Sequence, residues 1–210
     1  MNLGLIGVWS GALRRAERST VLDAAAELEE LGFGTIWFPA DPHAGLAEHI
    51  QNILAHTRRV VVATGPRMVE LAGRRSAGTH PYFVPPEHTR LARQTLGPGK
   101  VVAPEQMVVL ETEPARAREI ARRSIDRYLR LPNYTNNLLR LGFEECEFQN
   151  GGSDRVVAAI VAHGDAETVM HRVTEHLAAG ADHVCIQVLT ETPSTIPMHG
   201  FRQLATVLPS

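Results

Sequence analysis

Residues 165–189 read DAETVMHRVTEHLAAGADHVCIQVL, a helix followed by a strand. Asp165 is a typical helix N-cap, apolar residues recur at helical spacing from 169 to 177, and Gly180 suits the residue that ends the helix. The segment HVCIQVL at 183–189 is almost wholly apolar, which is typical of a strand covered on both faces of a parallel sheet. This stretch therefore predicts one helix-strand unit of an α/β fold.

The same alternation extends over most of the chain. Short apolar runs predict six strands, at 3–8, 34–38, 60–63, 80–84, within 101–111 and at 183–189. Helical patterns lie at 21–31, 46–57, 87–96, 115–129, 153–162 and 165–179. Strands that alternate with amphipathic helices imply a parallel sheet with right-handed crossovers, either closed as a barrel or open.

Chain length favours a shortened barrel. A closed eightfold barrel typically needs about 250 residues and rarely fewer than about 200. This chain has 210 residues, and it devotes about 130–165 to an excursion whose first part, 133–152, is polar and irregular. We therefore predict a TIM-barrel-like parallel (βα) barrel with about six strands, forming a single domain over 1–210.

Composition narrows the classes of partner. A formal net charge of -2 and a pI near 6.6 give no broad basic field, which argues against nucleic acid and anionic membranes and favours a small-molecule ligand. No basic leader or long apolar segment is present, so we expect a cytoplasmic protein. Cys146 and Cys185 are too few for a disulfide framework. His171 and His176 lie about 140° apart around a helix, so they do not form a metal-binding pair.

Several segments in sequence order resemble luciferase-like monooxygenases. They are LGLIGVW at 3–9, GFGTIWFP at 32–39, TRRVVVATG at 57–65 and AGADHVCIQVL at 179–189. Three further segments resemble the actinobacterial branch that uses coenzyme F420: PRMVELAGRRSAGTHPYFVPPEHT at 66–89, APEQMVVLETEPARAREIAR at 103–122 and LPNYTNNLLRLGF at 131–143. The chain departs from the family at the Gly65/Pro66 junction, where roughly two βα units, on the order of 75 residues, are missing.

The resemblance implies an oxidoreductase or monooxygenase that transfers a hydride between a deazaflavin and a small organic substrate. Coenzyme F420 is the expected cofactor, with FMN and flavin chemistry as the alternative. Members of the family often dimerise through helices of the N-terminal half, so a homodimer is expected. The shortened barrel leaves a second function open, that of a non-catalytic flavin-binding or structural protein. The sequence does not specify the substrate.

Ligands of parallel barrels lie over the carboxyl ends of the strands, so residues at those ends are the candidates for the cofactor site. The rings of Trp9 and Trp37 and the 63–64 backbone would form apolar walls. Gln187 is the lone amide of an apolar strand, where it either contacts a ligand or is a hydrogen-bonded core residue. His80, Tyr82 and Glu105 either line the pocket or form a solvated strand boundary. The full cofactor-binding set is Trp9, Trp37, Ala63, Thr64, Gly65, His80, Tyr82, Glu105 and Gln187.

His43 is the expected proton carrier and Asp41 the second candidate. Members of the family often place a histidine or an acid after the second strand, and histidine titrates near neutral pH. The alternative for His43 is a surface loop histidine. The family also implies a non-prolyl cis peptide near Thr64 and Gly65. The turn 151–153 before a helix suits either an anion or a simple helix cap.

Overall fold

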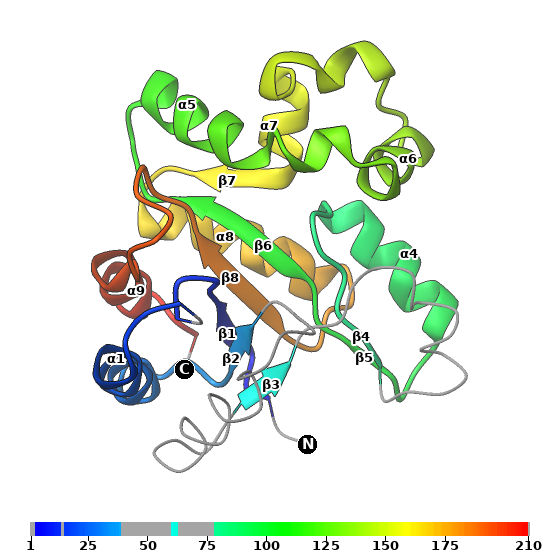
Figure 1. The fold of residues 1–210 in the computed structure, drawn as a ribbon. Helices are drawn as coiled ribbons and strands as arrows, with labels where there is room; N and C mark the ends of the chain where they lie inside the picture. The colour runs from blue at the N-terminus through cyan, green and yellow to red at the C-terminus, as the bar shows by residue number, and fades with distance from the viewer. Residues whose placement is uncertain (1–2, 14, 39–59, 63–77, 210) are drawn as a thin grey trace.

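The computed structural model describes residues 3–13, 15–38, 60–62 and 78–209, and it contains a six-stranded parallel sheet (Figure 1). The strand order is β3-β2-β1-β8-β6-β7. The strands are β1 (Ile6–Trp9), β2 (Ile36–Phe38), β3 (Val60–Val62), β6 (Glu105–Val109), β7 (Val161–His163) and β8 (Val184–Val188). A two-stranded parallel sheet pairs β4 (Gly78–Thr79) with β5 (Val101–Val102). The predicted parallel α/β fold is confirmed.

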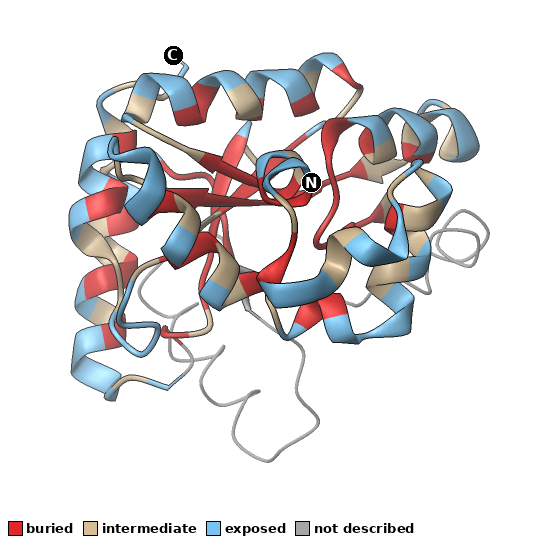
Figure 2. Cartoon of the chain, turned by 90° about the horizontal axis from the view of Figure 1, so that it is seen from above, coloured by how far each residue is buried: buried red, intermediate tan, exposed pale blue. Residues whose placement is uncertain are grey.

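Helices cover both faces of the main sheet. The α-helices are α1 (Arg18–Glu30), α4 (Pro86–Leu96), α5 (Pro114–Ile125), α6 (Pro132–Arg140), α7 (Asp154–Ile160), α8 (Ala166–Ala178) and α9 (Met198–Ala205). Two 3₁₀ helices, η2 (Tyr128–Arg130) and η3 (Glu145–Gly151), flank α6. Their outer surfaces are exposed while the strands between them are buried (Figure 2).

The strand register brings the two sequence-distant strands β1 and β8 together at the centre of the sheet. Gly7 of β1 lies opposite Cys185 of β8, and Cys185 lies opposite Glu105 of β6. Among the described strands, β3 and β7 stand at the two ends of the order and are not paired with each other.

Alternating side chains divide the sheet into two faces, which differ in composition. We call the first the α8 face: its strand residues pack against α1, α8 and α9, and they include Ile6, Val8, Ile36, Val108, Val184 and Ile186. The second, the α5 face, packs against α5, α7 and η2. Its strand residues include both tryptophans and the sulfur-containing side chains: Trp9, Trp37, Met107, Val109 and Cys185.

The last helix-strand unit closely follows the sequence pattern. Asp165 caps α8 by accepting a 2.8 Å hydrogen bond from the amide of Thr168. Gly180, with a φ of 102°, ends the turn after the helix, because this left-handed conformation favours glycine. Leu177 is only partly buried, and His176 takes its place on the buried side of the helix.

Two sequence predictions about strands are wrong. The strand predicted at 80–84 is instead the short β4 at 78–79, because Pro81 and Pro85 lack the amide hydrogens that a strand interior needs. The helix predicted over 153–162 ends at Ile160, and the next three residues form β7. Val161 pairs with Met107 there, so tertiary pairing overrides a local pattern that also fits a helix.

Other segments refine the prediction. The helix predicted to reach residue 129 ends at Ile125, and η2 continues the chain. The stretch 133–152, read as irregular, contains α6 and η3. The helix predicted at 46–57 lies outside the described residues. Within the described ranges, no helix combines the length and apolar character needed to cross a bilayer.

Candidate functional site

The α5 face brings together the six described cofactor-site candidates. Trp9 of β1 pairs in register with Trp37 of β2. On the other side of β1, Val8 pairs with Ile186 of β8, so the next residues, Trp9 and Gln187, lie at the same level of the sheet. The loop after β4 adds two more side chains from the opposite side: Tyr82 packs on Trp9 with ring centroids 5.2 Å apart, and His80 stacks on Trp37 at 4.5 Å.

Five predicted site residues cannot be placed on this face. His43, Asp41, Ala63, Thr64 and Gly65 lie outside the described residues. The expected cis peptide near Thr64 lies outside them too.

His80 is a buried, neutral histidine with one unused nitrogen. Its Nδ1 lies 2.6 Å from the carbonyl oxygen of Ala103, and because a carbonyl only accepts, Nδ1 carries the hydrogen. Burial lowers the pKa of His80 to about 4. Its Nε2 is therefore a hydrogen-bond acceptor, and this buried atom has no partner among the residues that the structure describes.

Glu105 is buried on the same face, with one oxygen unpaired. Oε2 accepts a long 3.4 Å hydrogen bond from the amide of Phe83, and Oε1 has no partner within the described part of the chain. Burial raises the pKa of the carboxyl group to about 8, so the acid is protonated at neutral pH. The sequence predicted that Glu105 lies just past the carboxyl end of a strand. In the structure it follows the short β5, but it is also the first residue of β6, so it lies at the amino end of the longer strand.

Trp9 supplies the third unpaired polar atom on this face, because no described residue accepts a hydrogen bond from its buried Nε1–H. A buried polar group without a partner costs about 1–3 kcal/mol, and most native buried groups are paired. Here a donor on Trp9, an acceptor on His80 and a protonated carboxyl on Glu105 are gathered on one face. The arrangement suits a ligand that has both donors and acceptors.

The loop that carries His80 and Tyr82 contains a strained residue. Phe83 has a φ of 60°, in the left-handed region that non-glycine residues rarely occupy. Its fully buried ring packs on Tyr128 and Tyr134, with centroids 5.2 and 5.4 Å apart, and this packing holds the conformation. Strain of this kind clusters at binding sites.

Trp37, in contrast to Trp9, is fully paired. Its Nε1 donates to His183 Nε2 at 3.0 Å, and His183 Nδ1 in turn donates to the carbonyl oxygen of Gly4 at 2.8 Å. The imidazole fills the space beside Gly7, where an added Cβ would lie 2.7 Å from Nε2. Trp37 is thus a fixed wall with its polar atom satisfied.

Sequence reasoning missed Tyr128, whose hydroxyl lies 2.8 Å from that of Tyr82. In the sequence, Tyr128 fits the apolar spacing of an ordinary core residue at the end of a helix. No local signal distinguishes such a tyrosine, since its partner is distant in sequence.

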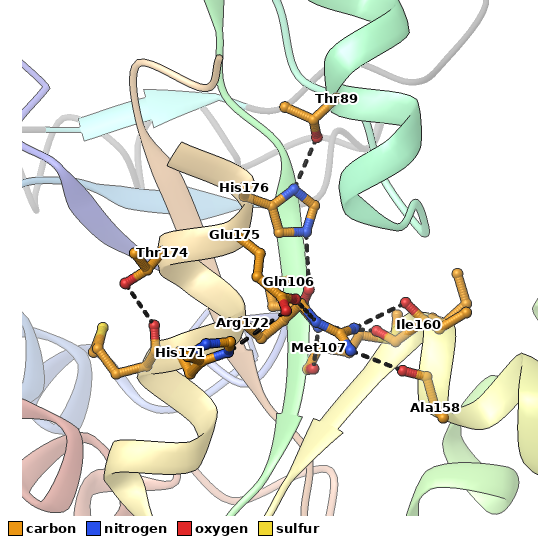
Figure 3. Close-up of polar contacts among 12 residues, drawn as sticks. Thr89, Gln106, Met107, Ala158, Ile160, His171, Arg172, Thr174, Glu175 and His176 are labelled. Atoms are coloured by element: carbon orange, nitrogen blue, oxygen red, sulfur yellow. Dashed lines mark hydrogen bonds and ion pairs between the residues drawn. The ribbon is translucent and has the colours of Figure 1, made fainter. Parts of the chain in front are cut away.

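The residues considered for metal binding have structural roles (Figure 3). His176 is buried and bonds to Thr89 Oγ1 at 2.8 Å and to Gln106 Oε1 at 2.9 Å. His171 is exposed and points to Glu175, with 3.5 Å between Nδ1 and the nearest carboxylate oxygen. Within the described ranges, no group of three metal-ligating side chains converges.

Two features lie outside the α5 face, a glycine-rich turn and a groove. Ser153 Oγ accepts the amide of Val156 at 3.2 Å, so the glycine-rich turn caps α7. A groove of about 620 Å³ runs between α4, α7 and α8, but none of the predicted site residues lines it. Two of its arginines, Arg155 and Arg172, are already paired with Glu147 and Glu175.

The sheet and its helices define a TIM-barrel-like parallel α/β fold, and comparison with solved structures agrees. An F420-dependent secondary alcohol dehydrogenase in complex with an F420-acetone adduct is similar at a TM-score of 0.68, with 12% identity over 98% of each chain. The coenzyme F420 dependent tetrahydromethanopterin reductase from Methanopyrus kandleri gives 0.65, with 9% identity over 98% of each chain. Apo-MsnO8 gives 0.53, with 11% identity over 96% of each chain.

At these identities the likeness shows a shared fold. No protein-family model matches the sequence, and no curated protein matches it.

Proposed function

We propose that this protein is an F420-dependent oxidoreductase of the luciferase-like type, transferring a hydride between the deazaflavin and a small organic substrate. The observation that carries the proposal is the set of buried, unpaired polar atoms of Trp9, His80 and Glu105 on the α5 face. The fold shared with two solved F420-dependent enzymes supports the same cofactor.

The side chains of the α5 face fit a flat heterocycle with polar edges. Trp9 and Tyr82 offer aromatic surface, and the unpaired atoms offer one acceptor, one donor and one protonated acid. When bound, F420 supplies the hydride-carrying ring carbon. Trp9 and Tyr82 would hold the ring, His80 Nε2 would accept a hydrogen bond, and Glu105 would hold a proton that it can donate.

The proton carrier for the substrate is proposed to be His43, with Asp41 as the second candidate. A residue after the second strand lies toward the carboxyl ends of the strands, where barrel enzymes bind substrate. The same proposal includes four further features. They are the absence of roughly two βα units at the Gly65/Pro66 junction, a single domain over 1–210, a cytoplasmic location and a homodimer. Light scattering tests the last of these, and a mass equal to one chain would exclude it.

A second candidate function is a shortened, non-catalytic barrel that holds FMN or another flavin, or that has only a structural role. The observation that favours it is the open order of the described strands, with β3 and β7 at the ends. An opened barrel encloses a ring less completely than a closed one.

Parallel absorbance and fluorescence titrations of the folded protein with F420 and with FMN test the proposal. We expect saturable binding of F420 in the micromolar range, about -8 kcal/mol. Turnover with a reduced cofactor then separates an enzyme from a carrier. His80→Phe should weaken binding, whereas His171→Phe, on the exposed side of α8, should leave it unchanged. Absence of binding of either cofactor would overturn the proposal.

A further inference from the structure

Gln187 is a half-buried amide held by one hydrogen bond on the α5 face. It lies near the carboxyl end of β8, opposite Met107 of β6. Its Oε1 accepts a 2.8 Å hydrogen bond from the hydroxyl of Tyr82. Among the described residues, the amide nitrogen Nε2 has no hydrogen-bond partner.

Two further residues, Tyr128 and Arg127, extend this hydrogen bond into a chain. Arg127 donates to the hydroxyl oxygen of Tyr128, and a guanidinium group can only donate. Tyr82 gives its one hydroxyl hydrogen to Gln187 Oε1. In the contact between the two tyrosine hydroxyls, which are 2.8 Å apart, Tyr128 is therefore the donor.

An amide oriented in this way presents its NH₂ group away from Tyr82. With the amide in this orientation, each link from Arg127 to Gln187 donates in the same sense, whereas rotating the amide by 180° would require the Tyr82 hydrogen to turn toward Tyr128. Gln106 shows the alternative, a core amide: its Oε1 bonds to His176, and its Nε2 donates to the carbonyl oxygens of Met107 and Ile160. Gln187 has only the acceptor half of such a set.

We propose that Gln187 is a specificity-determining donor for a carbonyl oxygen at the edge of the cofactor ring, with Tyr82, Tyr128 and Arg127 as positioning residues. The inference rests on the proposed function and adds a named contact to it. Deazaflavins and flavins both have carbonyl acceptors at the pyrimidine edge of the ring, so this contact selects the ring class. It does not distinguish F420 from FMN.

Titration of wild type and variants with F420 and FMN tests this role, with Kd and the position of the visible absorption band as readouts. Gln187→Leu should weaken binding roughly 3- to 10-fold, the worth of one hydrogen bond. Gln187→Glu should weaken it more, since a carboxylate oxygen would then face the ring carbonyl. Both should shift the absorption band of the bound ring relative to wild type.

Tyr82→Phe tests the positioning role, because it removes the hydrogen that fixes the amide. It should weaken binding less than Gln187→Glu and should shift the band in the same direction as Gln187→Leu, a change that loss of packing alone would not produce. Gln203→Leu, on the exposed side of α9, is the matched control and should leave both readouts unchanged.

Each outcome of this experiment decides a different claim. If wild type binds a cofactor and both Gln187 variants bind within twofold of it with an unshifted band, the role of Gln187 is overturned while the proposed function stands. If wild type binds neither cofactor, the proposed function fails and this inference fails with it. Thermal unfolding of each variant confirms that it is folded, and the near-isosteric Gln187→Glu decides the matter if the leucine variant unfolds.

Discussion

Glu105 and Gln106 are neighbours in β6, both buried, and they point to opposite faces of the sheet. On the α8 face, Gln106 has every polar atom paired, through His176 and the carbonyl oxygens of Met107 and Ile160 (Figure 3). On the α5 face, one oxygen of Glu105 has no partner among the described side chains and backbone. The two side chains are equally buried but differ in hydrogen bonding. The fully paired Gln106 stabilises the fold, whereas Glu105, with its unpaired oxygen, is suited to a ligand.

Two buried groups, Glu105 on the α5 face and His176 on the α8 face, affect stability with opposite dependence on pH. Burial raises the pKa of Glu105 from 4.5 to about 8, so its contribution to stability is present in acid and is lost as pH rises through 8. Burial, with Arg172 adding to it, lowers the pKa of His176 from 6.5 to about 3. The contribution of His176 is therefore lost as pH falls below 6.5. His80, on the α5 face, shares the acid response.

The largest effect is expected on the α8 face, from a substitution that removes the paired amide of Gln106. Gln106→Leu should lower the free energy of unfolding by about 3 kcal/mol or more, because it leaves the His176 N–H buried and unpaired and removes the hydrogen bonds to the carbonyl oxygens of Met107 and Ile160. Urea unfolding measures the loss, with the exposed Gln203→Leu as the control. A loss below about 1 kcal/mol would show that the pairing of Gln106 contributes little to the fold.

An intermediate effect is expected on the α5 face, from the titration of Glu105. In wild type, the free energy of unfolding should fall with rising pH between about 6.5 and 8, by up to about 1.4 kcal/mol per pH unit from Glu105. Glu105→Gln should remove that slope, since an amide does not titrate, while it can still accept from the Phe83 amide.

Urea unfolding at several pH values measures this slope. Glu119→Gln, on the exposed side of α5, should keep the wild-type slope. An unchanged slope in Glu105→Gln would mean that Glu105 ionises normally and is not a proton store.

The smallest effect concerns a paired polar group near the surface. Ser153→Ala should cost about 1 kcal/mol, because Val156 loses its capping acceptor at the start of α7. Affinity for F420 should be unchanged, since the turn is a cap. Ser124→Ala, which removes only a bond to the Ile120 carbonyl within α5, should cost less. A large loss of cofactor affinity in Ser153→Ala would instead assign the turn to an anion.

Local patterns were sufficient for the elements whose ends and buried sides are marked in the sequence. Asp165 and Gly180 bound α8 as predicted, and Pro114 begins α5. The pattern failed where pairing across the sheet decides the structure, as at β7, which the local sequence allows to be helical. It also failed at Glu105, because the break between β5 and β6 depends on pairing with two different neighbours.

For the candidate site, residue type and position selected side chains that do gather, but not their roles. Trp9, His80 and Tyr82 lie together on the α5 face. Their pairing state depends on partners distant in sequence, such as Ala103 for His80, and no periodicity encodes that. The orienting residues Tyr128 and Arg127 were missed for the same reason.

The pairing of β1 with β8 has a consequence for how the chain folds in the cell. The strand at Ile6–Trp9 is synthesised early, while its central partner at Val184–Val188 follows only after most of the domain. At translation rates of about 5–20 residues per second, β1 waits on the order of ten seconds or more for that partner. Nascent chains therefore carry an unpaired, apolar strand edge until late in synthesis, which makes the early translation products natural clients of ribosome-associated chaperones.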